Sequence, residues 1–425
     1  MSRHHPTLSL DRAVVAGGIR RPVLIRGGHD GWRTLTPAAA ELAPDAFLLV
    51  TPTGLPEAHT ARLTALLTTL APVRRLTLTS GAPDPEADRP LVPGTVVVAL
   101  GGTRVIQHAA GLAARGRRAG HGTRLIVAPS TPSAMTDTAL SAAHPSAPGF
   151  VPALVWTHLD LLRTLPPDEL RPGLAALVRN VLAVSPAFRT SVGDLLRPDR
   201  TGYDPRLMAR AIALSADIRA TLTAYDPDER GPAQALHYGR TVATALLALT
   251  GPRPTTDRPL PIARRLPGAG APTARRRALA HRATAPGPAP APRLHPGDAL
   301  ALGLLVAARV AVLLGVLTPG AERAHHELLE RWGAPRELPA PLTAADVAAV
   351  LRRGGASQGA VPAPHSGPAR MVLLGDLGRP HVVRGRLLTE VDHDVLTAAL
   401  EAIEPTTTTA QSAQSAQSAP QASVA

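Results

Sequence analysis

The sequence predicts an α/β N-terminal domain with a parallel sheet, followed by a mainly α-helical C-terminal domain. Short apolar runs alternate with helical stretches up to about residue 150, and helix-period apolar spacing dominates after it. Aromatic residues make up only 2% of the chain, so the cores consist of Ala, Leu and Val, which favours helices and buried parallel strands. A chain of 425 residues also exceeds the usual size of one domain.

We expect the N-terminal domain to cover residues 21–149, after a flexible N-terminus at 1–20. Five apolar runs predict buried strands, at 22–25, 47–50, 75–78, 96–100 and 124–127. Helices are expected at 56–70 and 105–118, which completes the βαβ order of a Rossmann-like parallel sheet. Gly101 and Gly102 follow the fourth strand, where such folds bring backbone amides to a ligand phosphate. The same glycine pair also suits a simple tight turn.

The C-terminal domain is expected to cover residues 150–403, because strand signals stop after Phe150. Apolar residues at helical spacing predict helices at 159–165, 173–184, 205–224, 234–249, 298–314, 324–332, 344–353 and 392–403, with a small hairpin from 371–374 and 380–383. The run at 299–317 is nearly long enough to span a membrane, but Arg309 lies at its middle. We therefore expect a buried core helix and no membrane association.

Two segments have compositions that oppose folding, an insert at 251–294 and a tail at 404–425. The insert holds nine arginines against one acid, and the tail is rich in Thr, Gln, Ser and Ala. Arginines alone can hold nucleic acid or an acidic partner by charge. Since aromatic residues are not interleaved with them, a disordered insertion is favoured over nucleic-acid binding.

The overall composition excludes several kinds of chemistry. Cysteine is absent, which removes disulfides, thiolate nucleophiles and cysteine-based zinc sites. All 45 basic residues are arginines, so the chain has no lysine for a Schiff base or a titrating amine. The first residues lack the apolar core of a signal peptide, and we expect a cytoplasmic protein.

Four motifs in a fixed order carry a family resemblance. They are Val-Val-Val-Ala-Leu-Gly-Gly at 96–102, Pro-Ser-Thr-Pro-Ser-Ala-Met-Thr-Asp at 129–137, Leu-Arg-Pro-Gly-Leu-Ala-Ala-Leu-Val-Arg at 170–179, and Asp-Pro-Asp-Glu-Arg-Gly at 226–231 with Leu-His-Tyr-Gly-Arg-Thr at 236–241. Over roughly residues 20–403 the chain resembles the 3-dehydroquinate synthase family of sugar-phosphate cyclases. The resemblance implies a dehydroquinate-synthase-like fold, with NAD against Gly101, Gly102, Thr131 and Asp137.

The family's reaction uses NAD and a divalent metal, usually zinc or cobalt, to oxidise an alcohol, eliminate phosphate and close a ring. One carboxylate and two histidines hold the metal, which acts as a Lewis acid. Carried over to this chain, the three ligand positions are Ala176, Arg240 and Pro296. None of these side chains binds zinc, so the resemblance implies a lost metal site. If the alignment shifts by one residue, His295 takes the place of Pro296 and supplies one metal ligand. The simpler interpretation is that His295 is a linker residue before the helix.

Other positions of the family pattern also differ. The second histidine of the signature is Thr244, and a lysine position falls on Ala143. An early Asp expected to contact the ribose is replaced by Pro52, and the third glycine of the turn is Thr103. These changes put NAD binding in doubt. His325 and His326, on the helix at 324–332, are expected on a solvated face.

The remaining charged positions suggest an anion site. Arg179 and Arg219 stand where the family has lysines, and His237 stands where it has asparagine. Two arginines can hold a phosphate or carboxylate bidentately, and His237 adds one hydrogen bond. The expected ligand is an anionic sugar phosphate.

Two hypotheses about activity stay open. In the first, the chain is a degenerate member without cyclase activity, either a homodimer, as relatives commonly are, or a partner of an active cyclase. In the second, it is a divergent cyclase or phosphate lyase that uses Arg179, Arg219, His237 and Arg240 as catalytic residues. A weaker third hypothesis is binding of anions or nucleic acid through the arginine-rich insert.

Overall fold

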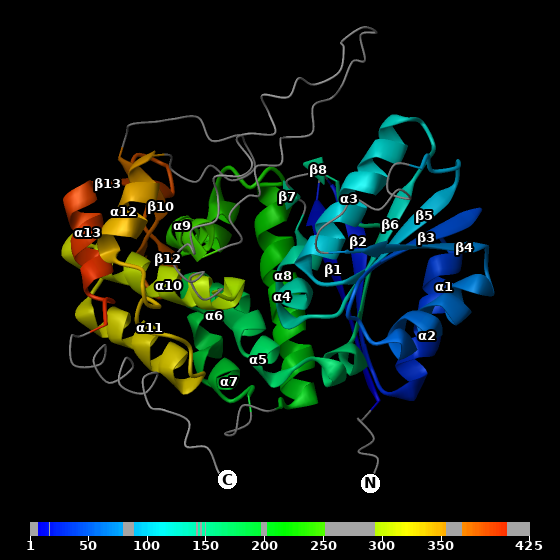
Figure 1. Ribbon diagram of the computed structural model, residues 1–425, viewed down its shortest axis with the longest axis horizontal. Coiled ribbons are helices and arrows are strands. Elements are labelled where there is room, and N and C mark those ends of the chain that lie inside the picture. Colours follow the sequence, from blue (N-terminus) through cyan, green and yellow to red (C-terminus); the bar gives the residue numbers. More distant parts are fainter. Residues whose placement is uncertain are drawn as a thin grey trace, which may run out of the picture.

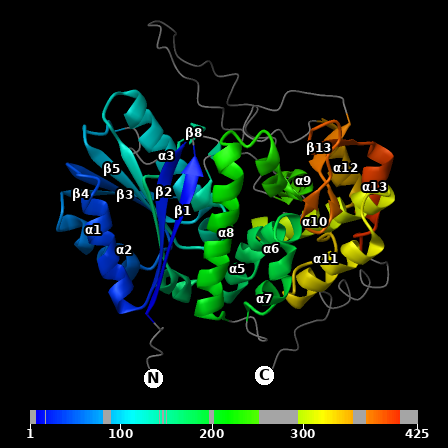
Figure 2. The same ribbon diagram turned by 180° about the vertical axis from the view of Figure 1, so that it is seen from behind.

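The structure is a computed structural model, and it describes residues 7–16, 18–79, 89–141, 143–144, 147–148, 150–196, 202–250, 294–353 and 368–405. A sheet with flanking helices forms one side of the molecule, and a helical domain forms the other (Figure 1). The long helix α8 (Pro205–Tyr225) lies between them and packs against the sheet edge (Figure 2). The expected combination of a parallel α/β domain and a helical domain is confirmed.

The N-terminal sheet has seven strands in the order β1-β2-β9-β6-β5-β3-β4. Their bounds are β1 Leu8–Ala16, β2 Ile19–Gly27, β3 Ala46–Pro52, β4 Val73–Leu78, β5 Thr95–Gly101, β6 Arg124–Pro129 and β9 Leu154–His158. All pairs are parallel except β1 with β2. All five predicted strands are present. The central ones are buried on both faces, which explains their continuous apolar sequences.

Two strands of this sheet lie outside the expected limits. Strand β1 occupies residues 8–16, so the prediction of a flexible N-terminus at 1–20 is wrong for this part. Leu8 and Leu10 pack on the core while Ser9 is exposed, the alternation of an edge strand with one wet face. Strand β9 lies beyond Phe150, where strand signals were expected to stop. Its five buried residues fill the gap between β2 and β6, a long-range pairing that local spacing does not encode.

Helices cover the sheet in the expected places. They are the 3₁₀ helix η1 His29–Thr34, α1 Leu35–Ala40, α2 Glu57–Thr68, α3 Thr103–Arg118, α4 Pro132–Thr136 and η3 Thr138–Leu140. The predicted helices at 56–70 and 105–118 correspond to α2 and α3. A short ladder, β7 Ala143–His144 with β8 Ala147–Pro148, follows η3.

The helical domain begins after β9. Its elements are η4 Leu159–Thr164, α5 Pro167–Leu170, η5 Pro172–Leu174, α6 Ala175–Ala183, η6 Pro186–Phe188, α7 Arg189–Gly193, α8, η7 Pro232–His237, α9 Arg240–Thr250, α10 Pro296–Leu313, α11 Pro319–Arg331, α12 Ala344–Arg353, α13 His393–Glu401, and the strands β10 Ala369–Val372, β11 Leu374–Asp376, β12 Arg379–Pro380 and β13 Leu388–Val391. The expected hairpin is only partly correct, because β10 pairs with β13 while β11 pairs with β12.

One predicted helix is divided by a glycine. The expected helix at 234–249 is η7 followed by α9, because Gly239 has a φ of 77°, which an α-helix does not accommodate. Gly239 also meets α10 closely, since a Cβ built at Gly303 would lie 2.1 Å from the Gly239 carbonyl oxygen. Two glycines therefore let the start of α9 approach the middle of α10.

Helix α10 is long and apolar enough, by length and composition, to cross a membrane. In the folded chain 67% of that window is buried, and the helix packs against α6, α9, α11 and α13. This is the packing of a core helix, as expected. Most of the arginine-rich insert, residues 251–293, and the tail from 406 onward lie outside the described residues.

Candidate functional site

Three charged side chains meet where the two domains adjoin. Asp137 follows α4, Arg179 comes from α6 and Arg219 from α8. Arg179 Nη2 donates to Asp137 Oδ1 at 3.1 Å, and Arg219 Nη2 donates to the same oxygen at 2.6 Å. Both guanidinium groups are almost completely buried, with side-chain exposures of 1% and 6%. The single negative charge of Asp137 thus offsets part of the positive charge of two buried guanidinium groups.

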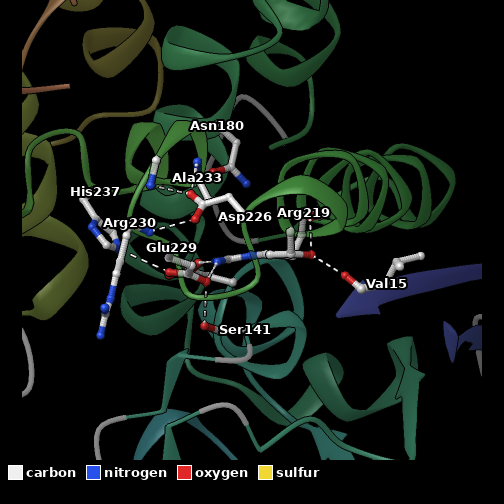
Figure 3. Close-up of polar contacts among 12 residues, drawn as sticks. Val15, Ser141, Asn180, Arg219, Asp226, Glu229, Arg230, Ala233 and His237 are labelled. Carbon is white, nitrogen blue, oxygen red and sulfur yellow. Dashed lines mark hydrogen bonds and ion pairs between the residues drawn. The ribbon is translucent and has the colours of Figure 1, made fainter. Parts of the chain in front are cut away.

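Glu229 is the second carboxylate of the cluster, and Figure 3 shows the groups around it. Arg219 Nη1 forms an ion pair with Glu229, and His237 Nε2 lies 3.3 Å from Glu229 Oε2. Ser141 Oγ donates to Glu229 Oε1 at 3.4 Å. The sequence interpretation gave Glu229 no role, although it belongs to the motif at 226–231. An acid in a motif that directly precedes the His237 signature is the signal that could have identified it.

Asp226 holds the turn that presents Glu229. Its carboxylate accepts backbone N–H bonds from Arg230, Gly231 and Ala233 at 2.9, 2.7 and 3.0 Å (Figure 3). Glu229 itself has a φ of 53°, a left-handed conformation that costs a non-glycine residue free energy. The three bonds to Asp226 stabilise this conformation, so the turn positions Glu229 toward Arg219 and His237.

The charges of the cluster, together with burial, shift the pKa values of its side chains. Burial opposes ionisation of Asp137, but the charges of Arg179, Arg219 and Arg240 outweigh it and hold the pKa of Asp137 below its ordinary value. The pKa of Glu229 is likewise lowered, since the His237 hydrogen bond and Arg219 exceed the effect of burial. Burial lowers the pKa of His237 against the pull of Glu229. At neutral pH the cluster therefore contains ionised carboxylates beside a neutral imidazole.

Arg240 begins α9 and belongs to the same electrostatic environment. Its side chain is exposed, unlike those of Arg179 and Arg219. Desolvation by the surrounding protein lowers its pKa, Asp137 opposes this shift, and Arg179 and Arg219 add to it. No hydrogen bond or ion pair holds its guanidinium among the described residues. Arg240 is the cation of this cluster that remains open to a ligand.

The residues at the three metal-ligand positions do not fit a divalent cation. Ala176 and Pro296 carry no donor atom, and Arg240 brings a fixed positive charge. In the described parts of the chain, no group of three His, Cys, Asp or Glu side chains gathers at ligand spacing. His295 is engaged otherwise: Nδ1 accepts the Gly297 N–H at 3.0 Å and caps α10, while Nε2 lies 3.1 Å from Glu169.

Three of the four residues expected to contact NAD lie close together: Gly101 and Gly102 at the carboxyl end of β5, and Thr131 after β6. Connections leave β3 and β5 in opposite directions, which is the switch point where α/β sheets bind ligands. A Cβ at Gly101 would lie 2.7 Å from Val105 and 3.2 Å from Pro52, and one at Gly102 would lie 3.3 Å from Thr131.

These residues fit the phosphate of a dinucleotide but not its ribose. No side chain caps the first turn of α3, whose N–H groups suit a phosphate. The side chain of Pro52, however, offers no acceptor to a ribose hydroxyl. Asp137 and Thr131 have protein partners here, the two arginines and the Ala134 N–H respectively, and their contact with a cofactor stays a prediction.

One buried pair corrects an expectation about the helix α11. His325 is fully buried and not on a solvated face. Its Nδ1 donates to the Ala321 carbonyl at 2.8 Å, and Tyr238 Oη lies 2.9 Å from Nε2. Because Tyr238 precedes Gly239 and Arg240, this pair anchors the start of α9. His326 is only partly buried.

Comparison with known proteins places the chain in a family. It is 31% identical to 2-deoxy-scyllo-inosose synthase of Streptomyces lividus over 322 residues, which cover 73% of this chain and 71% of the relative. It is 30% identical to 3-dehydroquinate synthase of Xanthomonas campestris over 191 residues, 45% of this chain and 42% of that protein. No protein-family model matches the sequence.

A solved structure shows the same fold. A 2-deoxy-scyllo-inosose synthase in complex with carbaglucose-6-phosphate, NAD⁺ and Co²⁺ superposes with a TM-score of 0.69 at 19% identity, and the match covers 93% of this chain and 99% of that one. The order of motifs, the two-domain fold and the identity to the Streptomyces lividus enzyme agree. This chain belongs to the dehydroquinate synthase-like superfamily of sugar-phosphate cyclases.

Proposed function

We propose that this protein binds an anionic sugar phosphate at the family site but does not catalyse metal-dependent cyclisation. The observation that carries the proposal is the set of residues at the metal positions, Ala176, Arg240 and Pro296. A cation at this place would face the positive charge of Arg240 and would lack both the carboxylate and the imidazole ligands. The family's oxidation and elimination steps depend on that Lewis acid.

The charge balance of the site supports an anionic ligand. Three guanidinium groups, from Arg179, Arg219 and Arg240, stand against two carboxylates, from Asp137 and Glu229. Arg179 and Arg219 already have carboxylate partners, so Arg240 supplies the free positive charge. An arginine binds phosphate through two parallel hydrogen bonds. The proposed ligand is therefore a phosphorylated sugar whose phosphate contacts Arg240.

A second candidate function is a divergent phosphate lyase, and the Glu229–His237 contact favours it. A neutral imidazole 3.3 Å from a carboxylate is the arrangement of a general base that the carboxylate orients. On a substrate oxidised to a ketone with NAD as the oxidant, His237 would remove a proton from the carbon next to the carbonyl. Phosphate would leave from the following carbon as a C=C bond forms, with arginines stabilising its charge. Turnover without added metal distinguishes this function from the first.

A turnover assay tests both candidates. The ligand of the solved relative, carbaglucose-6-phosphate, is an analogue of glucose 6-phosphate. We expect purified protein with glucose 6-phosphate and NAD to release no inorganic phosphate, whether Co²⁺, Zn²⁺ or no metal is added, and to form no carbocyclic product by mass spectrometry. Phosphate release without added metal would favour the lyase. The Streptomyces lividus enzyme, assayed in parallel, is the positive control. A rate comparable to that of the control would overturn the proposal.

Restoring the ligands gives a sharper test of the metal argument. The triple variant Ala176→Glu, Arg240→His and Pro296→His places a carboxylate and two imidazoles on α6, α9 and α10, which pack together. After dialysis against Zn²⁺ we expect about one bound ion per variant chain and far less in the unmodified protein, measured by elemental analysis. Equal metal content in both proteins would contradict the ligand assignment.

The remaining functional expectations follow from this proposal. We propose a cytoplasmic protein that forms a homodimer or associates with an active cyclase, and NAD is its candidate N-terminal ligand. Sedimentation of the protein alone and with an active cyclase tests the assembly. Deletion of residues 251–294 tests the arginine-rich insert, because loss of nucleic-acid binding on deletion would favour the third hypothesis.

A further inference from the structure

A second cavity, of about 620 Å³, lies behind the turn that carries Glu229. Its walls come from the end of α6, from α8 at Leu222, from residues 230–232, 234 and 235, and from the segment at 378–388. The cavity lining includes none of the candidate-site residues Asp137, Arg179, Arg219, Glu229, His237 and Arg240. The volume falls within the range of small-molecule sites, which is about 300–1,000 Å³.

The lining combines apolar walls with positive charge. Val184, Leu222 and Leu387 are among the apolar side chains. Arg230 and Arg386 also line the cavity, and none of the acidic residues that the structure describes does. In the described chain neither guanidinium has a hydrogen bond or ion pair. The apolar Val382, another lining residue, is 57% exposed. An apolar pocket with two arginines in its lining and an exposed apolar residue suits an anion with an apolar body.

The cavity shares one stretch of backbone with the candidate site. Glu229 contacts Arg219 and His237, whereas the residues directly after it line the cavity. Asp226 holds this stretch through the N–H groups of Arg230, Gly231 and Ala233 (Figure 3). A ligand against residues 230–235 would therefore restrict the turn that positions Glu229.

The opposite wall is fixed to the domain. The Gly378 N–H donates to the Leu182 carbonyl at 2.7 Å, and Gly378 packs against Pro186, where a Cβ would lie 2.5 Å from the proline ring. Hydrogen bonds hold both walls, to the Asp226 carboxylate on one side and to the Leu182 carbonyl on the other. The cavity is a preformed space between them.

We propose that this cavity is a second binding site, which takes a small amphipathic anion and couples its occupancy to the Glu229 turn. The head group, a carboxylate or a phosphate, pairs with Arg386 and Arg230, and the apolar part lies against Val184, Leu222 and Leu387. The inference concerns binding alone and does not depend on the proposed function of the first site.

Calorimetric titration of the full chain tests the site with n-octyl phosphate, n-octanoate and neutral n-octanol. We expect both anions to bind and the alcohol to bind at least about tenfold more weakly, because a charge-assisted hydrogen bond is lost. Arg386→Gln and Val382→Asp should each weaken anion binding about tenfold or more. Arg384→Gln, on the same segment but outside the lining, is the matched control and should leave the affinity unchanged.

Two further measurements separate this site from its alternatives. Bound n-octyl phosphate should slow hydrogen exchange at the amides of residues 230–233, and Arg240→Gln should leave its affinity unchanged. Equal binding of n-octanol, or loss of binding only in Arg240→Gln, would overturn the proposal. If no probe binds and Val382→Asp dissociates a dimer in sedimentation, the cavity is an interface between copies and the proposal is wrong.

Discussion

Replacing Asp137 by Asn tests whether one carboxylate holds the arginine cluster together. In the structure Asp137 accepts from Arg179 at 3.1 Å and from Arg219 at 2.6 Å. Without the charge of Asp137, Arg219 still has Glu229 as a partner, but Arg179 retains only the side-chain oxygen of Asn180, at 2.9 Å. A guanidinium that is 1% exposed would then lack a counter-ion.

The expected loss of stability follows from this unpaired charge. Breaking a buried ion pair by removing one partner costs about 3–5 kcal/mol, and we expect a decrease of that size in the free energy of unfolding. Because the native-state pKa of Asp137 is lowered, this contribution is present above the ordinary Asp pKa and is lost as the pH falls below it. The difference between wild type and variant should therefore be full at pH 7 and should shrink in strong acid.

The same variant should bind anions more tightly. Removing one carboxylate leaves Arg179 available and raises the net charge of the site by one, so we expect inorganic phosphate to bind about tenfold more strongly. Urea unfolding followed by circular dichroism measures the stability, and calorimetric titration measures the affinity.

A surface carboxylate provides the matched control. Asp194→Asn removes a pair with Arg331 in which both side chains are about half exposed, at 51% and 53%, and should cost less than about 1 kcal/mol. If Asp137→Asn is no more destabilising than this control and phosphate affinity does not change, the argument from the arginine cluster is refuted.

Three other predictions concern the packing, the pH response and the cofactor. Burial lowers the pKa of His325 to about 4, against about 6.5 in an unfolded chain, so acidification from pH 7 to 4 should remove about 3 kcal/mol of stability. The variant His325→Gln should therefore show a flatter dependence of its unfolding free energy on pH, measured by urea unfolding. An unchanged slope would contradict the assignment. Gly303→Ala brings a Cβ within 2.1 Å of the Gly239 carbonyl oxygen and should destabilise the protein by about 1–3 kcal/mol or more. The melting temperature measures this loss. An unaltered melting temperature would mean that α9 and α10 are farther apart. Pro52→Asp supplies a ribose acceptor at the end of β3 and should raise NAD affinity in calorimetry; no gain would mean that NAD does not bind at this switch point.

Local sequence patterns predicted much of this fold because each depends on neighbouring residues. Buried strands such as β5 are continuous apolar runs, and α3 and α8 repeat apolar residues at helical spacing. The order of motifs also predicted the family, and the chain belongs to it. The proposed loss of the metal ligands also rests on the sequence, since side-chain identity alone decides whether Ala176 or Pro296 has a donor atom.

Long-range pairing was decided only by the tertiary structure. Strand β9 is recognisable once it lies between β2 and β6, and β1 becomes ordered by pairing along β2 and packing on α8. In the same way the role of Glu229 depends on a turn held by Asp226, which brings the carboxylate to the Arg219 guanidinium and the His237 imidazole, both from other elements. Most helices and strands and the family could be predicted from the sequence, because they depend on local patterns and on side-chain identity. The tertiary structure decided which charges meet, because burial and ion pairing depend on segments that are far apart along the chain.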